Sequence, residues 1–140
     1  MNFIQSISTC MRKYVTFSGR ATRSEFWWFY LFTVLVNLVA TSQASSFVPA
    51  LLDGQDMTEN ESSYFLNNFF FLYLSTITSL ILLLPSLAVA VRRLHDVGRS
   101  GWWILIAFTV IGIIPLLIWY VTDTKDEENV YGQNPKTEDN

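Results

Sequence analysis

The sequence has few of the residues that build catalytic or metal sites. It contains one cysteine, Cys10, and one histidine, His95. A single cysteine cannot form a disulfide within the chain, and a structural zinc site needs about four Cys, His, Asp or Glu ligands close together. We therefore expect no metal ion and no cofactor.

Charged residues are also scarce. Asp, Glu, Lys and Arg make up 15% of the 140 residues, whereas hydrophobic residues make up 51% and aromatic residues 16%. Soluble domains carry about 25% charged residues, so this composition is typical of a membrane protein. The basic residues lie mainly in two short groups beside apolar runs, which argues against binding of nucleic acid.

Three long apolar runs predict an all-α, polytopic helical membrane protein. The expected transmembrane helices cover about residues 26–48, 67–91 and 102–121. Each run has about 20 residues or more, enough to cross a hydrocarbon core about 30 Å thick. Thr22, followed three residues later by Glu25, is a capping-box pattern and predicts where the first helix starts. A cleaved signal peptide is the alternative for this first run, but the long leader and the two later runs favour a retained helix.

The runs divide the chain into an N-terminal segment, 1–24, a membrane domain, 25–121, and an acidic flexible tail, 122–140. The N-terminal segment has apolar residues at helical spacing, which predicts an interfacial helix; a partly ordered segment is the alternative. Tryptophan favours the membrane–water interface. The expected interfacial anchors are Trp27, Trp28, Trp102, Trp103 and Trp119.

Basic residues near the ends of membrane helices are retained in the cytoplasm. Residues 1–24 contain four basic and no acidic residues, whereas residues 49–66 contain four acidic and no basic residues. We therefore expect a cytoplasmic N-terminus, a cytoplasmic stretch at 92–103 and an external loop at 49–66. Three complete spans would place the tail outside as well.

Two interpretations of the third run stay open. Its length matches one complete span, which favours that interpretation. Gly112 and Pro115 can instead break the run into a re-entrant hairpin, which would return the tail to the starting side.

Small side chains recur along one stripe of the second run. They are Ser75, Ser79, Ser86 and Ala90. Such a stripe lets a neighbouring helix approach closely, so we favour helix packing, within the chain or in a homo-oligomer, over a solvated pathway.

The stretch 92–103 concentrates charge between two apolar runs. Candidates for binding an anionic headgroup or a partner are Arg92, Arg93, His95, Asp96 and Arg99, with Arg20 and Arg23 at the same membrane level. Guanidinium groups suit phosphate recognition. The alternative is that the arginines only fix topology, with an aspartate paired to one of them. Gly98 suits a left-handed helix end and Ser100 suits an N-cap, so a tight reversal between helices is expected.

Catalysis is not expected from this stretch. Neighbouring helical positions point about 100° apart, so Asp96 does not readily orient His95 as a general base. None of the three apolar runs contains an ionisable Asp, Glu, Lys, Arg or His, which argues against a transport pathway through one chain.

Three segments carry distinctive motifs: FSGRATRSEFWW at 17–28, RRLHDVGRSGWW at 92–103 and NVYGQNP at 129–135. In combination and order they resemble the domain of unknown function 805 family of small bacterial inner-membrane proteins, from about Tyr14 to Pro135. The resemblance implies a multi-pass protein of the bacterial inner (plasma) membrane. It carries over no catalytic residues, because the family has no settled biochemical activity.

The expected function is therefore that of a non-catalytic membrane component that binds lipids, anionic ones included, or partner proteins. A subunit of an oligomeric transporter or channel is the alternative.

Overall fold

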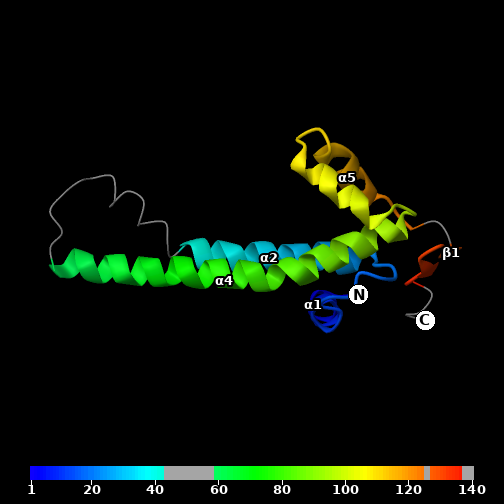
Figure 1. The fold of residues 1–140 in the computed structure, drawn as a ribbon. Coiled ribbons are helices and arrows are strands. Elements are labelled where there is room, and N and C mark those ends of the chain that lie inside the picture. The colour runs from blue at the N-terminus through cyan, green and yellow to red at the C-terminus, as the bar shows by residue number, and fades with distance from the viewer. Residues whose placement is uncertain (43–58, 125–126, 137–140) are drawn as a thin grey trace. The chain divides into compact units, whose positions relative to one another are not determined.

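The computed structural model describes residues 1–42, 59–124 and 127–136, and most of these residues are helical. The helices are α1 (Phe3–Arg12), α2 (Arg23–Ser42), α4 (Glu59–Asp96), the 3-10 helix η1 (Gly101–Phe108) and α5 (Ile113–Val121). Two antiparallel strands follow, β1 (Glu128–Asn129) and β2 (Gly132–Gln133), with Asn129 opposite Gly132 (Figure 1). The mainly helical fold is confirmed, and the small strand pair adds an element that the sequence did not predict.

Two helices in the described part of the chain, α2 and α4, are long and apolar enough to cross a membrane. The 20 residues of α2 rise by about 30 Å, which matches the thickness of a hydrocarbon core. The expected spans 26–48 and 67–91 fall on these helices, although residues 43–48 lie outside the described residues. Helix α4 already begins at Glu59, inside the segment that the sequence predicted to be a loop. Residues 49–58 of that predicted loop lie outside the described residues.

The third apolar run does not form one continuous helix. Helix η1 ends at Phe108, and α5 begins only at Ile113. The rings of Trp103 and Trp119 lie 5.5 Å apart, so the two short helices run back along one another. The expected continuous helix over 102–121 is therefore wrong, and three transmembrane helices are not confirmed.

The chain forms two compact units, one of residues Phe32–Leu82 and one that combines Met1–Leu31 with Leu83–Asn140. In the first unit, the Ser79 hydroxyl donates to Oδ1 of Asn37 over 2.7 Å, which joins α4 to α2. Ser75 is buried and donates to the carbonyl of Leu72. These two members of the serine stripe therefore lie at contacts within the chain. The other two, Ser86 and Ala90, belong to the second unit, where Ala90 is buried.

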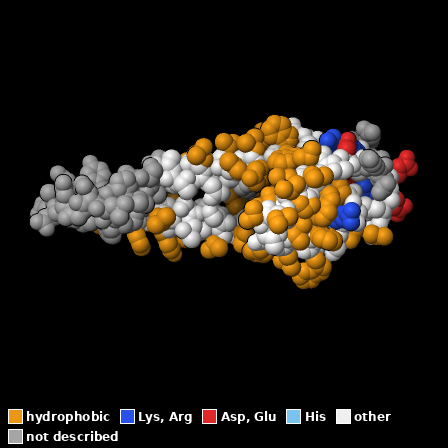
Figure 2. Space-filling model, turned by 90° about the horizontal axis from the view of Figure 1, so that it is seen from above, with side chains coloured by type: hydrophobic (Ala, Val, Ile, Leu, Met, Phe, Trp, Pro, Cys, Tyr) orange, Lys and Arg blue, Asp and Glu red, His pale blue; other side chains and the backbone are white. Residues whose placement is uncertain are grey.

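We call Met1–Leu31 with Leu83–Asn140 the basic-end unit, because it holds all the arginines of the chain. Its apolar core comprises Ala21, Phe26, Phe29, Ala88, Val89, Leu94 and Leu116. Figure 2 shows hydrophobic side chains over much of one face of the unit, with charged side chains gathered at one end.

Helix α1 confirms the helix expected in the N-terminal segment. It starts with a capping box between Asn2 and Gln5, and it packs against α2 through the small buried residues Ser6 and Cys10. Large apolar residues on the other side, such as Ile4, are exposed. The interfacial position of α1 stays a prediction.

Candidate functional site

Asp96 is the centre of a buried ionic cluster at the end of α4. Its Oδ1 accepts a hydrogen bond from Nε of Arg20 over 2.9 Å, and its Oδ2 accepts from Nη1 of Arg93. The Thr124 hydroxyl also donates to Oδ2. The side chains of both arginines and of Asp96 are at most 1% exposed. One carboxylate therefore holds two guanidinium groups inside the protein.

Backbone carbonyls complete the surroundings of Arg93. Its guanidinium donates to the carbonyls of Ala21, Tyr120 and Thr122. Arg20 donates to the carbonyl of Gly132 over 3.0 Å. The cluster thus joins the end of α5 and the strand pair to α4. Residues 122–124 and 127–134 therefore depart from the flexible tail that the sequence predicted.

A second buried pair lies one turn away. Nη1 of Arg92 donates to Oε1 of Glu25 over 2.6 Å, and both side chains are almost completely buried. Within the described part of the chain, Nε and Nη2 of Arg92 have no hydrogen-bond partner. Thr22 caps α2 by accepting from the backbone N–H of Glu25, as predicted, whereas the Glu25 carboxylate bonds to the arginine.

The thiol of Cys10 also faces Glu25, with its sulfur 3.7 Å from Oε1. Burial, with a smaller contribution from the Glu25 carboxylate, raises the pKa of Cys10 to about 12. A thiol with such a pKa stays protonated at neutral pH and is a poor nucleophile. Cys10 therefore packs as a small apolar residue.

His95 takes part in the anchoring of the tail and does not contact Asp96 through its ring. Its Nδ1 lies 3.2 Å from the carbonyl of Gly19, and its ring stacks on Tyr131 at 3.9 Å between centroids. Asn129 donates to the carbonyl of His95 over 2.9 Å. This carbonyl belongs to the last turn of α4, so the strand pair caps the helix.

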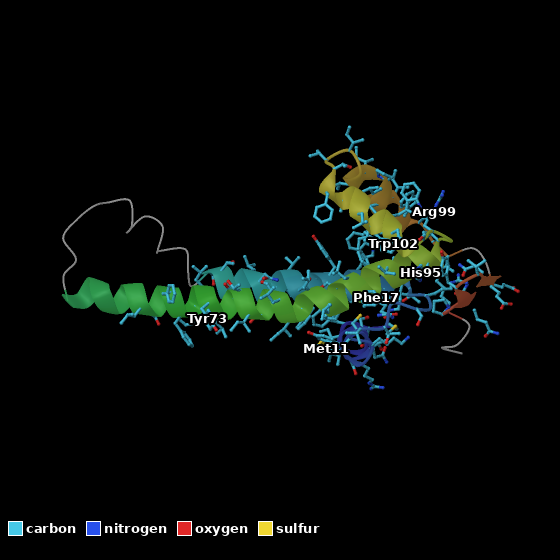
Figure 3. The ribbon with its side chains drawn as sticks, viewed as in Figure 1. Met11, Phe17, Tyr73, His95, Arg99 and Trp102 are labelled. Carbon is cyan, nitrogen blue, oxygen red and sulfur yellow. The ribbon has the colours of Figure 1, made fainter. Side chains whose placement is uncertain are left out.

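The reversal after α4 has the geometry that the sequence predicted. Gly98 has a φ of 71°, in the left-handed region, and donates its N–H to the carbonyl of His95. Ser100 caps η1 by accepting from the N–H of Trp102. Figure 3 shows His95 near the end of α4, with Arg99 and Trp102 at the base of the η1–α5 hairpin. Arg99 lies over the ring of Trp119 at 5.1 Å, a cation–π contact.

A pocket of about 560 Å³ opens beside the start of α2. It is lined by Met1, Thr22, Arg23, Ser24, Trp27, Val121 and Lys136. Asp123 bridges its two cations, 2.9 Å from Nη2 of Arg23 and 2.6 Å from Nζ of Lys136. The hydrogen bond from Lys136 and the nearby positive charges hold the pKa of Asp123 below its usual value. Both cations are partly exposed, unlike Arg20, Arg92 and Arg93.

The structure thus separates the predicted site residues other than the half-buried His95 into two groups. Arg20, Arg92, Arg93 and Asp96 are buried in ion pairs, whereas Arg23 and Arg99 are exposed. The predicted anchors Trp27, Trp28, Trp102, Trp103 and Trp119 all belong to the basic-end unit. Trp28 stacks edge-on against Phe3 of α1.

Sequence reasoning missed several partners of these residues, namely Glu25, Thr124, Asn129, Tyr131 and Lys136. The capping-box pattern identifies Glu25 only as part of the start of α2. Asn129 and Tyr131 belong to the motif at 129–135, whose distinctiveness was the one available signal that the tail takes part in the fold. In residues 1–42, 59–124 and 127–136, no three or more His, Cys, Asp or Glu side chains are grouped to hold a metal ion.

Comparison with known proteins places this arrangement in a family. The sequence model of the family described as "Protein of unknown function (DUF805)" matches residues 14–133, which include the ionic cluster and the strand pair. The chain belongs to the DUF805 family. This DUF805 protein is 36% identical over 127 residues to the inner membrane protein YhaI of Escherichia coli (strain K12), covering 90% of the chain and 91% of that protein.

A second relative of the DUF805 protein is the inner membrane protein YhaH of the same organism. It is 35% identical over 132 residues, covering 91% of the chain and 93% of that protein. No solved structure matches the chain. The family, these relatives and the two apolar helices identify a helical protein of the inner membrane.

Proposed function

We propose that this DUF805 protein is a non-catalytic membrane component that binds anionic lipid headgroups. The observation that carries the proposal is the pocket of about 560 Å³ with two partly exposed cations, Arg23 and Lys136. Both cations already hold the carboxylate of Asp123 between them, and carboxylate and phosphate oxygens are recognised by the same donors. Trp27 lines the pocket and suits the headgroup level of a bilayer.

The buried arginines have a different role in this proposal. Arg20 and Arg93 are paired with Asp96 and with backbone carbonyls, and Arg92 is paired with Glu25. A headgroup could reach these arginines only by displacing their buried partners. Breaking a buried ion pair costs about 3–5 kcal/mol. We therefore assign headgroup binding to Arg23 and Lys136, and assembly of the basic-end unit to the buried arginines.

Orientation follows the distribution of basic residues. The N-terminus, the reversal at 97–100 and the pocket lie in the cytoplasm in this proposal, with a multi-pass chain whose segment 49–58 faces the opposite side. Positive residues near membrane ends favour this orientation, and the cytoplasmic leaflet carries the negative surface potential that attracts them.

Lipid retention by purified variants tests the headgroup pocket. Each cation near an anionic lipid surface contributes about 1 kcal/mol to the free energy of binding. Arg23→Gln and Lys136→Gln should therefore each lower the amount of phosphatidylglycerol retained by about fivefold. Asp123→Asn should raise retention, because it removes the carboxylate that competes for the same two cations. Lipid is extracted from detergent-purified protein and quantified by mass spectrometry against phosphatidylethanolamine.

Lys13→Gln is the matched control, since it removes an exposed cation of the same segment that does not line the pocket. Equal losses in Lys13→Gln and Arg23→Gln would show that only overall charge matters, and would overturn the pocket. Unchanged retention in the double variant Arg23→Gln with Lys136→Gln would do the same.

The alternative role, as a subunit of an oligomeric transporter or channel, has weaker support. The polar groups of Asn37, Ser75 and Ser79 bond within the chain, as expected for helix packing. Homo-oligomers through the stripe remain a proposal that chemical crosslinking would test. Ion flux across liposomes containing the purified protein would favour the alternative.

A further inference from the structure

The helices η1 and α5 form a closed hairpin whose turn is hydrogen-bonded. Gly112 donates its N–H to the carbonyl of Thr109 over 3.0 Å, and Thr109 donates to the carbonyl of Ile106 over 2.9 Å. A side chain at Gly112 would collide with the backbone carbonyl of Ile106, so the turn requires glycine for close approach. These bonds satisfy backbone groups within the turn itself, as favours an element surrounded by lipid.

Both ends of the hairpin are fixed at the same end of α4. It begins at Ser100, immediately after the reversal, and the N–H of Arg99 bonds to the carbonyl of Leu94. It ends at Tyr120 and Thr122, whose carbonyls accept from Arg93. A segment held in this way cannot cross a membrane completely.

The tip of the hairpin is apolar and exposed. Phe108 is 89% exposed, Val110 84% and Ile111 83%. No charged residue lies between Arg99 and Asp123. At the base, in contrast, the ring of Trp103 contacts the ring of Trp119, and the Arg99 guanidinium lies over the Trp119 ring. Polarity thus falls from an interfacial base to an apolar tip, which matches the change from headgroups to acyl chains.

The length of the hairpin limits how deep it can reach. Eight residues of 3-10 helix rise by about 16 Å, and nine residues of α-helix rise by about 14 Å. A hydrocarbon core is about 30 Å thick, so either arm reaches about half of it.

We propose that the η1–α5 hairpin inserts into the acyl chains of one leaflet, on the side of the 92–103 stretch, and returns without crossing. The occupant of its exposed apolar surface is lipid, because this surface has no charged residue and lies beyond a base of tryptophans and arginine that suits the headgroup level. The tail then lies on the same side of the membrane as the N-terminus. This inference does not rest on headgroup binding, because the hairpin can insert even if the pocket binds no lipid. The pocket does require the tail on the side of the N-terminus, since Arg23 and Lys136 both line it.

Single cysteines in a Cys10→Ser background test the insertion. Lys13→Cys and Glu128→Cys mark the N-terminal segment and the tail, Asp53→Cys marks the segment between α2 and α4, and Val110→Cys marks the tip. A membrane-impermeant maleimide is added to right-side-out and inside-out vesicles. We expect Lys13→Cys and Glu128→Cys to react from one side and Asp53→Cys from the other, while Val110→Cys reacts at least tenfold more slowly from both sides.

A second measurement locates the tip. Val110→Cys is labelled with bimane in detergent and reconstituted with lipids brominated at different acyl positions, and quenching should be strongest for bromines inside the acyl layer. Reaction of Glu128→Cys from the side of Asp53→Cys would show a complete crossing and overturn the proposal. Reaction of Val110→Cys at the rate of Lys13→Cys, or absence of bromine quenching, would place the tip in water and overturn it as well.

Discussion

Arg20 and Asp96 are 76 positions apart in the sequence, yet Nε of the arginine lies 2.9 Å from Oδ1 of the aspartate, and both side chains are buried. Arg93 shares the same carboxylate. The contact joins the segment before α2 to the last turn of α4. Two of the three distinctive motifs therefore meet at one carboxylate, and the third contacts the same arginine, because the carbonyl of Gly132 accepts from Nη1 of Arg20.

Asp96→Asn should destabilise the protein strongly. The substitution leaves Arg20 and Arg93 buried without a counter-charge, and removal of one member of a buried ion pair costs about 3–5 kcal/mol. Unfolding by SDS titration in mixed micelles, followed by tryptophan fluorescence, measures the change. Asp123→Asn, which breaks an exposed bridge, should have a much smaller effect. Equal stability of Asp96→Asn and the unsubstituted protein would contradict a structural role of the cluster.

The Arg92–Glu25 pair should show strong coupling between its two members. Glu25→Met alone leaves a buried guanidinium unpaired and should cost about 3–5 kcal/mol. The double variant Arg92→Met with Glu25→Met should come within about 1 kcal/mol of the original stability, because apolar side chains of similar volume can replace a buried pair. The same SDS titration, applied as a double-mutant cycle, measures the coupling. Additive losses would show that the two residues act separately.

Loss of the tail anchors should expose the tail to protease while α2 and α4 stay folded. Asn129→Ala removes a hydrogen bond between the strand pair and the end of α4, worth about 1 kcal/mol. The fraction of molecules in which the strand pair is detached from α4 should therefore rise by about fivefold. Tyr131→Ala removes the stacking on His95 and should act in the same direction. The rate of trypsin cleavage after Lys125, followed by mass spectrometry, reports the change. Val130→Ala is the control, because its side chain is 90% exposed; cleavage at the same rate in all three variants would argue against anchoring.

Cys10 should resist alkylation in the folded protein. Its pKa of about 12 keeps the thiol protonated, so the rate should not rise between pH 7 and 9 as it does for a free thiol. The pKa of Cys10 is higher in the folded protein than its ordinary value of 9.0. The fold therefore keeps its full stability below pH 9 and loses the contribution of the protonated thiol as the pH rises from 9 towards 12. N-ethylmaleimide labelling with and without SDS, followed by intact mass, tests this. Rapid labelling of the folded protein would contradict the burial of the thiol.

The sequence by itself determined the features that depend on local chemistry. Apolar runs long enough for a bilayer identified α2 and α4, and the capping pattern at Thr22 located the start of α2. Gly98 and Ser100 fixed the reversal after α4, because a left-handed position and an N-cap each favour a particular residue type. The three motifs also pointed to the family that the comparisons established.

Only the tertiary structure decided which charges are buried and how the third apolar run folds. Positive-inside reasoning treats all arginines near a membrane alike, but Arg93 is buried by contacts with Asp96 and with carbonyls about 30 positions later in the chain, whereas Arg23 stays partly exposed. The length of residues 102–121 matches one complete span, and only Gly112 and Pro115 pointed to a hairpin. The bonds from Arg93 to the end of α5 support the hairpin, because they return the chain to the helix it left.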